Sequence, residues 1–549
     1  MKIQIPVKQG DIISLDINGL GSSGEGVGKY EGFTVFVKGA LPTETVSVKI
    51  TLVKKSYAVG ALQEIIKTSA ERVEPACPVY KECGGCQLQH LSYAGQLAAK
   101  REQVQAALAR IGHLDVEVLP VLGAANPWNY RNKMQFPAAM DAEGILNIGC
   151  YATATHSVID TENCLIQKKA NNEIVLTVRK WMQHFGISAY NEKTGKGLVR
   201  HVMGRVGVHS GETMAVIITS EYDIPHRRVL IEWLKKHVPG LTAIIQNINK
   251  KNTNIVMGNK TRVIYGNPSI KDSLGALNFN ISAQSFFQVN SEQAEKLYNK
   301  ALEFAALSGN ETVVDVYCGT GTISLYLAKH AQKVYGIEIV APAIDDAKKN
   351  AEENGCKNAE FILGDAAVEL PKLLNGGVQP DVIIVDPPRA GCEEKVLAAM
   401  ARVEPQRIVY VSCNPASLAR DLHYLEEHGY KTLIAQPVDM FPMTSHVETV
   451  VLLSKGEIDS KKVRVEFSLE DMDMSGFQKG ATYEQIKAYV LEHSGLKVSS
   501  LYISQIKRKC GLEVGQNYNL SKKEDAKVPQ CPPEKESAIR EALKFYNLI

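Results

Sequence analysis

A series of short apolar runs, each ending in glycine, an acid or cysteine, dominates the chain between residues 312 and 413. The intervening segments have the periodicity of amphipathic helices. Such alternation is typical of a parallel sheet covered by helices, because strands buried on two faces are apolar throughout. The pattern predicts a doubly wound α/β domain whose strand ends share one edge. The predicted strands are Thr312–Val316, Lys333–Glu338, Phe361–Leu363, Asp381–Val385 and Val409–Ser412.

The first 67 residues carry a different pattern, in which short alternating runs are broken by the glycine-rich stretch Gly19–Gly26. Thr34–Val37 and Val46–Ile50 are two of these runs. Short strands with turn signals between them predict a small β-barrel. Barrels of the oligonucleotide-binding type bind single strands with their sheet and loops. A purely structural SH3-like barrel would show the same pattern, so the pattern alone leaves RNA contact open.

Helical periodicity marks further segments. Ser92–Ile111 is a continuous helical pattern, and the span from Val116 to Leu274 mixes strands and helices. Near the C-terminus, Thr482–Glu492 is amphipathic, and Ser499–Cys510 is a second helix that carries consecutive cations. Two helices joined by a short turn resemble a helix-turn-helix. A plain helical cap or a partner module is an equal interpretation.

These patterns predict a multidomain α/β protein with four regions. They are an N-terminal barrel, a central α+β domain, a Rossmann-like doubly wound domain and a helical extension of unknown role. We expect these regions at residues 1–67, 68–274, 275–456 and 457–549.

Length and composition fit this division. At 549 residues the chain exceeds the roughly 250 to 300 residues that one core serves. Hydrophobic residues make up 45% of the chain, yet no apolar run approaches the roughly 20 residues that span a bilayer. The N-terminus lacks an apolar signal segment, so we expect a cytoplasmic protein without membrane spans. The net charge of +2 neither supports nor excludes nucleic acid as a partner.

The stretch Cys318–Gly321 follows the first strand of the α/β domain and precedes a helical segment. In doubly wound sheets, a glycine turn at this place lets a ligand approach the backbone. Glu338 ends the next strand, where the hydroxyl groups of a ribose need an acceptor. The sequence therefore predicts a cofactor pocket at the carboxyl edge of the sheet.

Cys413 ends the last strand of this series, directly before Asn414 and Pro415. Asn is favoured at the N-cap of a helix and Pro at its first position. The positive end of such a helix favours a thiolate, which makes Cys413 a candidate nucleophile. A buried apolar cysteine at a strand end is the alternative.

Cys77, Cys83 and Cys86 lie within ten residues, and Cys164 follows downstream. The glycines between them let the backbone wrap tightly, as is typical of soft-metal ligation. A disulfide framework is disfavoured, because the total of eleven cysteines is odd and a signal segment is lacking. Zinc and an iron–sulfur cluster both take four thiolates, so spacing leaves both open.

Five motifs resemble those of class I S-adenosylmethionine-dependent methyltransferases, and within them the RNA uridine-5-methyltransferases. Ser324 stands where a dinucleotide dehydrogenase would have a third glycine, and Arg389 follows Asp-Pro-Pro where amino-group methylases have an aromatic residue. The motifs are Phe286–Asn290, Asp315–Gly321, Asp386–Gly391, Ser412–Pro415 and His446–Glu448.

The resemblance implies methylation of uracil at C5, which is a poor nucleophile until a thiolate adds to C6. It implies that Cys413 is this nucleophile and that Glu448 removes the C5 proton. Without the resemblance, Glu448 is a structural glutamate at the start of the final strand. The resemblance also implies that Phe286 stacks on a flipped base. The implied cofactor contacts are Gln288, Tyr317, Thr322, Glu338 and Asp386, with Asp365 near the adenine.

The ribosomal-RNA branch of this family carries a four-iron cluster, and its ligands correspond to Cys77, Cys83, Cys86 and Cys164. The resemblance therefore implies a [4Fe-4S] cluster, with zinc as the alternative and Cys150 as a rival fourth ligand. The predicted barrel corresponds to the family's TRAM domain, and the predicted helix at residues 92–111 would pack on the catalytic sheet.

Tyr130–Met134 resembles a further family motif, in which Arg131 and Lys133 could meet phosphates.

Taken together, the resemblances lead us to expect a monomeric 23S rRNA (uracil-5-)-methyltransferase that binds large-subunit ribosomal RNA. The nearest enzymatic alternative is methylation of the T-loop uridine of tRNA. A non-catalytic RNA-binding or assembly factor is a third alternative, against which the intact Cys413, Asp386 and Glu448 argue.

Overall fold

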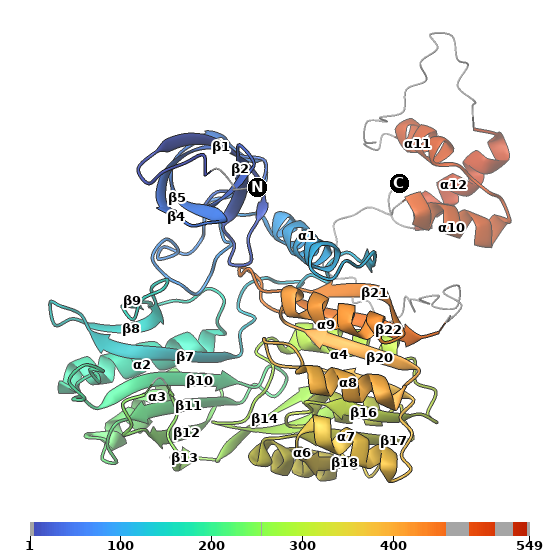
Figure 1. The fold of residues 1–549 in the computed structure, drawn as a ribbon. Coiled ribbons are helices and arrows are strands. Elements are labelled where there is room, and N and C mark those ends of the chain that lie inside the picture. Colours follow the sequence, from blue (N-terminus) through green and yellow to red (C-terminus); the bar gives the residue numbers. More distant parts are fainter. Residues whose placement is uncertain (1–4, 254, 457–482, 511–530, 546–549) are drawn as a thin grey trace. The chain divides into compact units, whose positions relative to one another are not determined.

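A closed five-stranded barrel forms the N-terminal part of the computed structural model (Figure 1). Its strands follow the spatial order β1-β2-β3-β5-β4 and are β1 (Ile12–Leu20), β2 (Gly26–Tyr30), β3 (Phe33–Lys38), β4 (Thr45–Val53) and β5 (Tyr57–Lys67). Alternate side chains of β1, from Ile13 to Ile17, point into the barrel core. A glycine is required at position 60, because β5 lies so close to Val48 of β4 that an added Cβ would be 2.0 Å from Val48 Cγ1. The predicted barrel is confirmed.

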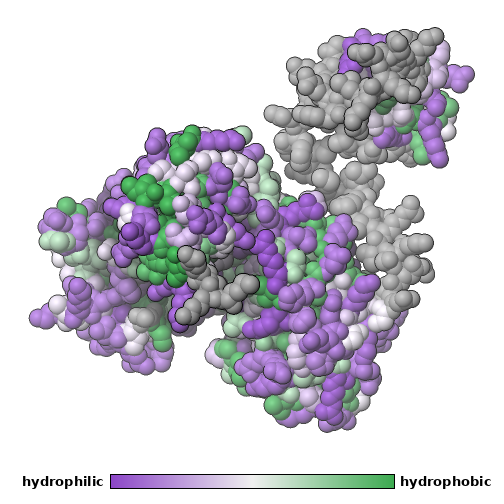
Figure 2. All heavy atoms as spheres, turned by 45° about the horizontal axis from the view of Figure 1, so that its top comes forward, coloured by the Kyte–Doolittle hydropathy of each residue, from purple (hydrophilic) through white to green (hydrophobic). Residues whose placement is uncertain are grey.

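The structure describes residues 5–253, 255–456, 483–510 and 531–545. The chain divides into two units, residues 1–462 and 463–549. On the described surface, hydrophilic side chains alternate with small apolar patches (Figure 2). Ile12, Leu52 and Ile66 are barrel residues that stay exposed.

A seven-stranded mixed sheet follows the barrel along the chain. Its strands, in spatial order, are β13 (Lys260–Gly266), β12 (Leu241–Ile248), β11 (Thr213–Thr219), β10 (Val199–Val206), β7 (Lys133–Met140), β8 (Leu146–Tyr151) and β9 (Val158–Asp160). Two helices, α2 (Lys169–Phe185) and α3 (Arg227–His237), cover one face, where Trp181 and Leu230 pack on Val202. The opposite face packs through Met203 and Ile245 into the core of the next sheet. Both faces are therefore buried.

The third sheet has eight strands and is mostly parallel. In spatial order they are β18 (Ala359–Leu363), β17 (Lys333–Glu338), β16 (Thr312–Val316), β19 (Val382–Val385), β20 (Arg407–Ser412), β22 (Glu448–Lys455), β21 (Tyr430–Val438) and β6 (Glu117–Val118). Strands β16 to β20 are parallel and match the five predicted strands, whereas β22 runs antiparallel to β20. The doubly wound sheet is confirmed. The sequence grouped Glu117 and Val118 with the central region, but they form the edge strand of this sheet.

Helices cover both faces of the eight-stranded sheet (Figure 1). On one face lie α4 (Ser291–Ala305), α5 (Thr322–Ala328) and α6 (Ala341–Glu353), with the hairpin β14 (Ser269–Leu274) and β15 (Leu277–Ser282) beside them. On the other lie α1 (Tyr93–Arg110), α7 (Ala366–Asn375), α8 (Glu394–Val403) and α9 (Pro415–Glu427). Ser92 caps α1, which packs on α9 and β21 as expected from the sequence.

Three helices make up the described part of the second unit, α10 (Tyr483–Ser494), α11 (Ser500–Lys509) and α12 (Pro533–Phe545). Ile503 and Ile506 of α11 are buried against Ile539 of α12. The sequence predicted the first two helices but not the third. Lys509, one of the consecutive cations, pairs with Glu536 at 2.7 Å. Throughout the described ranges, no helix combines the length and apolarity that a membrane span needs.

A loop between β21 and β22, residues 439–447, is held by buried polar contacts, and we call it the anchored loop. Lys100 of α1 pairs with Asp439 at 2.5 Å, and both side chains are at most 1% exposed. Tyr93 donates a hydrogen bond to the same carboxylate at 2.9 Å, and Gln96 accepts one from the Met443 amide at 3.0 Å. Because the anchored loop leads directly into Glu448, α1 fixes the start of β22.

Removing the charge of Lys100 should strongly destabilise the protein, because it leaves the Asp439 carboxylate buried without a partner. We expect Lys100→Met to lower the free energy of unfolding by about 3 to 5 kcal/mol in a denaturant titration. The control is Lys250→Met, since Lys250 pairs with Glu221 at the surface and both side chains are 65% exposed. That change should cost less than about 1 kcal/mol. Equal losses for the two variants would contradict the anchoring role.

Candidate functional site

Seven of the residues predicted from the sequence line one cavity of about 490 Å³ at the carboxyl edge of the eight-stranded sheet. Parallel strands place their carboxyl ends at the same edge, and the antiparallel β22 begins there. The loop between β15 and α4 closes the cavity from a second side. The seven residues are Phe286, Gln288, Tyr317, Thr322, Asp386, Cys413 and Glu448.

The glycine turn after β16 adopts backbone conformations that its sequence makes accessible. Gly319 and Gly321 have φ angles of +55° and +79°, and an added Cβ on Gly321 would lie 2.8 Å from the Phe361 ring. Tyr317 is a non-glycine residue with a φ of +66°, a conformation that costs free energy and often marks a functional site. The turn therefore brings bare backbone to the cavity wall.

Glu338 and Asp365 lie at the ends of β17 and β18 but are not among the residues that line this cavity. Glu338 accepts hydrogen bonds from the amides of Gly319 at 3.2 Å and Val340 at 2.9 Å. Asp365 caps α7 and pairs with Lys395 at 2.8 Å, and this pair holds the pKa of Asp365 below its usual range. Both carboxylates therefore have local structural partners.

Cys413 stands between β20 and α9, and the predicted cap is present. Asn414 is the N-cap of α9, and its side chain accepts from the Ala416 amide at 3.1 Å. The expected thiolate stabilisation is wrong in direction, because the pKa of the Cys413 thiol is raised to about 11. Burial is the largest cause, followed by the negative charges of Glu448 and Asp386, whereas Arg389 acts in the opposite direction. Burial and the acidic neighbours together therefore raise the pKa of this thiol despite its place at a helix N-terminus.

Buried acids crowd the cavity beside this thiol. Burial and the nearby Asp386 raise the pKa of Glu448 to about 8, although Arg389 opposes the shift. Burial raises the pKa of Asp386 to about 7, and that of Asp315 to about 7 as well. A cation placed among these groups would favour their ionised forms. The cavity is therefore suited to a positively charged ligand.

Sequence reasoning missed Asn132, which positions a cavity residue. Its side-chain amide donates to the Gln288 carbonyl at 2.9 Å and to Ser291 Oγ at 3.0 Å, and its backbone amide donates to the Val289 carbonyl at 2.8 Å. Asn132 lies in the motif singled out for Arg131 and Lys133, so the signal was available. His446 also lines the cavity, although the sequence assigned it no role.

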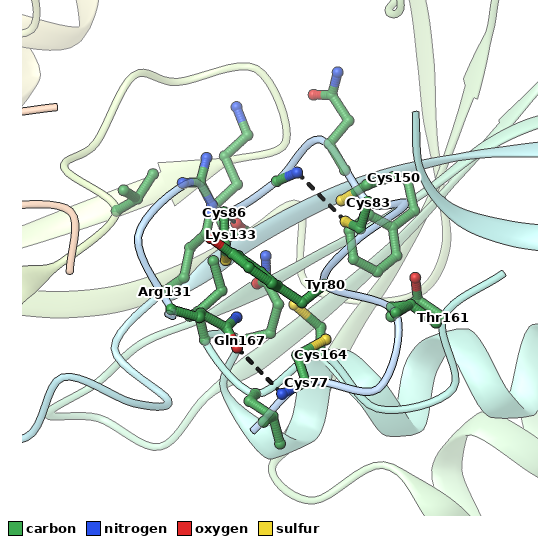
Figure 3. Close-up of a pocket in the computed structure, with 18 residues that line it drawn as sticks. Cys77, Tyr80, Cys83, Cys86, Arg131, Lys133, Cys150, Thr161, Cys164 and Gln167 are labelled. Carbon is green, nitrogen blue, oxygen red and sulfur yellow. Dashed lines mark hydrogen bonds between the residues drawn. The ribbon is translucent and has the colours of Figure 1, made fainter. Parts of the chain in front are cut away.

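A second cavity, of about 410 Å³, is lined by cysteines from three segments of the chain (Figure 3). The four predicted ligands gather there together with the rival Cys150. All eleven cysteines of the chain lie in the described ranges, and all are free of disulfides. The cysteines that line this cavity are Cys77, Cys83, Cys86, Cys150 and Cys164.

The donor set of this cavity suits a cluster bound by thiolates. Gly85 donates its amide to Cys83 Sγ at 3.3 Å, and an added Cβ there would lie 3.4 Å from both Cys83 Sγ and Cys150 Sγ. Gln89 accepts from the Cys77 amide at 3.1 Å, which fixes that loop. Within the described residues, however, no three such side chains converge as the ligands of one metal ion do.

Comparisons with known proteins agree with this geometry. Residues 92–456 match the model of the tRNA (uracil-5-)-methyltransferase family, and residues 6–62 match the TRAM domain. An uncharacterized RNA methyltransferase of Clostridium tetani is 50% identical over 454 residues, 83% of this chain and 98% of that protein. One from Bacillus cereus is 50% identical over 457 residues, 83% of this chain and 99% of that protein.

Among solved structures, the tRNA (uracil-54, C5)-methyltransferase of Pyrococcus abyssi, bound to S-adenosyl-L-homocysteine, is 29% identical to this chain. It superimposes with a TM-score of 0.65 and covers 80% of this chain and 100% of its own. The sheet, its glycine turn and the cavity at its edge define a class I S-adenosylmethionine-dependent methyltransferase. The chain belongs to the tRNA (uracil-5-)-methyltransferase family of RNA-modifying enzymes, and its barrel is a TRAM domain.

The raised pKa of Glu448 predicts a pH-dependent stability difference. The pKa of Glu448 is about 8 in the folded protein against an ordinary value of 4.5. The contribution of Glu448 to the free energy of unfolding is therefore fully present below pH 4.5, and it is lost as the pH rises through 8. Glu448→Gln removes the charge. The unfolding temperature of the variant minus that of the wild type should therefore increase by about 1 to 3 °C from pH 5 to pH 9. Exposed Glu352→Gln is the control and should show no such gain. A pH-independent difference for Glu448→Gln would contradict the raised pKa.

Proposed function

We propose that this protein is a 23S rRNA (uracil-5-)-methyltransferase, which methylates C5 of a uridine in large-subunit ribosomal RNA. One observation carries the reaction. Cys413 and Glu448 arrive from separate strands, yet they share one cavity with Gln288 and Asp386. A nucleophile and a base on either side of a uracil ring are the groups that methylation at C5 requires.

In the proposed mechanism, Cys413 Sγ adds to C6 of the uracil, and the electron pair of the C5–C6 double bond makes C5 nucleophilic as part of an enolate. Bound S-adenosylmethionine would supply the electrophilic methyl group, which C5 takes as the bond from the methyl group to the sulfonium sulfur breaks and a neutral thioether is left. Glu448 then takes the C5 proton, and Cys413 leaves C6 as a thiolate while the double bond re-forms. Arg389 offsets negative charge beside both groups, as the directions of their pKa shifts indicate.

The raised pKa of Cys413 supports one order of binding. Burial, Glu448 and Asp386 favour the protonated thiol, so a cation beside these acids would lower the pKa of the thiol. A sulfonium ion is such a cation. We therefore propose that the cofactor binds before Cys413 attacks, which limits unproductive addition of the thiol to RNA.

Contacts to the ligands follow from the cavity. Phe286 is 64% exposed, so its ring is available to stack on a flipped base. We propose that Glu338 binds the ribose and that Asp365 reaches the adenine once it releases Lys395, because such a surface pair is weak. Ile339 and Leu363 are exposed apolar residues at the ends of the same two strands and would flank the adenine ring. Gln288, Tyr317, Thr322 and Asp386 are the remaining proposed cofactor contacts.

We propose that Cys77, Cys83, Cys86 and Cys164 hold a [4Fe-4S] cluster. Such a cluster attaches its thiolates at four separate irons, and these four cysteines line one cavity. A zinc ion, which also takes four thiolates, is the alternative. Cys150 is the fifth thiol of the cavity and the rival to Cys164.

The cysteine cavity also supports the ribosomal target, because the resemblance ties this ligand set to the ribosomal-RNA branch. The family name and the Pyrococcus abyssi enzyme support tRNA as the second candidate substrate. The TRAM barrel is the proposed additional RNA contact. Mapping of 5-methyluridine by mass spectrometry in ribosomal and transfer RNA from a deletion strain would decide between the two. Loss from the T-loop of tRNA alone would overturn the ribosomal assignment.

Cys413→Ala should abolish methylation and leave cofactor affinity within about twofold, because the thiol reacts with the base and not with the cofactor. RNA that carries 5-fluorouridine has no C5 proton to remove, so the wild type should retain a methylated covalent adduct on a denaturing gel. Cys413→Ala should form none, and the buried Cys356→Ala control should behave as the wild type does. Turnover by Cys413→Ala would refute the nucleophile.

With RNA that carries ordinary uridine, Glu448→Gln should accumulate a covalent, methylated complex of protein and RNA. The reason is that proton removal follows methyl transfer in the proposed order. The measurement is the fraction of protein that migrates with RNA after a single turnover. Free product at the rate of the wild type would return Glu448 to a structural role.

Protein purified without oxygen should be brown and contain about four irons per chain, because thiolate-to-iron charge transfer absorbs visible light whereas zinc is colourless. Cys164→Ser should lose the metal and Cys150→Ser should keep it. Stoichiometric zinc in place of iron would contradict the cluster. Loss of metal from Cys150→Ser alone would make Cys150 the fourth ligand.

A further inference from the structure

Three cationic side chains meet between the cysteine cavity and the loop that carries Phe286. Lys133 on β7 and Arg205 on β10 are directly paired in the antiparallel ladder of these two strands. Arg131 lies two residues before Lys133. Arg205 is 3% exposed, and Arg131 and Lys133 are partly buried. We call these three residues the cation cluster.

The cation cluster has no counter-charge from the protein within the described ranges. Arg131 donates to the Lys133 carbonyl at 3.3 Å, and none of the three pairs with a carboxylate. Burial and the positive charges of Arg205 and Arg131 lower the pKa of Lys133 to about 8, as expected for like charges held together. Buried cations without an anion are costly, so such a cluster is stabilised by an anion from outside the polypeptide.

The positions of the three cations connect the two cavities. Arg131 and Lys133 line the cysteine cavity, and both are labelled in Figure 3. Arg131 also lines the cavity that holds Cys413 and Glu448. Arg205 donates to the carbonyls of Ala283 and Ser285, immediately before Phe286. A charge placed in the cysteine cavity therefore acts on groups that border the proposed uridine site.

We propose that the cation cluster is the counter-charge of the thiolate-ligated cluster, and that occupancy of the cysteine cavity thereby sets the affinity for RNA. This inference rests on the proposed function. Four thiolates outweigh the positive charge of an iron–sulfur core, so the bound group is an anion. With it, the three cations are held together, and Arg205 keeps the Phe286 loop in place. Without it, their mutual repulsion acts on that loop. Arg131, Lys133 and Arg205 are positioning residues in this scheme.

The coupling is selective. Three of the proposed cofactor contacts, Tyr317, Thr322 and Asp386, come from the strand ends and the glycine turn of the eight-stranded sheet. Gln288 alone lies on the loop that Arg205 holds. Loss of the metal group should therefore weaken RNA binding much more than binding of S-adenosyl-L-homocysteine. A metal group that served stability alone would affect both ligands or neither.

The first test compares full-length wild-type protein, loaded without oxygen, with the same protein after chelation of its iron. RNA binding is measured with unmodified large-subunit ribosomal RNA from a deletion strain, and cofactor binding with S-adenosyl-L-homocysteine by calorimetry. We expect RNA affinity to fall by about tenfold and cofactor affinity to change by less than about twofold. Equal RNA affinity in the two states would overturn the coupling. Absence of iron from the loaded wild type would instead contradict the proposed cluster itself.

The second test changes the charge beside an intact metal group. Lys133→Met should shift the midpoint reduction potential to a more negative value, because loss of a nearby cation disfavours the added electron. Lys133→Arg keeps the charge and should retain the potential and the RNA affinity of the wild type. Exposed Lys169→Met removes the same charge elsewhere and is the control.

An unchanged potential in Lys133→Met with full iron content would refute the counter-charge role. If Lys133→Met fails to fold, Arg131→Gln supplies the same measurement from the neighbouring cation. An unchanged potential in that variant would refute the role equally.

Discussion

The buried ion pair between Lys100 and Asp439 is the constraint on which the catalytic geometry depends. Both charges are withdrawn from water, and their mutual attraction offsets the desolvation free energy only when the two groups are in direct contact. Tyr93 donates a further hydrogen bond to the Asp439 carboxylate and reinforces this contact. Because the pair joins α1 to the anchored loop, it fixes the direction in which the chain enters Glu448. The proposed base is thus placed by a helix that precedes it by more than 300 residues.

The two cavities of the first unit differ in the charged side chains that line them, and their proposed ligands differ accordingly. Asp315, Asp386 and Glu448 line the cavity at the sheet edge. Burial raises the pKa of all three, and the charge of Asp386 adds to the shift of the other two, so a cationic cofactor is favoured there. Arg131 and Lys133 line the cysteine cavity, where an anionic group is favoured. Arg131 borders both cavities. Residues 131–133 therefore lie between a cavity that favours a cation and a cavity that favours an anion. The same residues hold Gln288 through the Asn132 side chain.

Local signals predicted the fold and much of the site. The five parallel strands, the glycine turn and the Asn414 cap follow from short-range patterning, so the sequence located them. Features set by residues distant in the chain escaped prediction. The strand Glu117–Val118 is too short to carry a pattern, and its place depends on pairing with β21. The direction of the Cys413 pKa shift depends on Glu448 and Asp386, whose proximity becomes visible only after folding.

The short edge strand β6 has a consequence for how the chain is assembled. After β6 the polypeptide leaves the eight-stranded sheet at Leu122, forms the whole seven-stranded sheet, and returns so that Gln293 donates a hydrogen bond to the Leu122 carbonyl at 2.8 Å. One domain is therefore nested inside another, and its entry and exit lie side by side. During synthesis, the first strand of the outer domain must wait for β21, the partner beside which it docks. The nested architecture lets the inner domain begin and end at one point of the outer domain, so its insertion interrupts the outer domain at a single place.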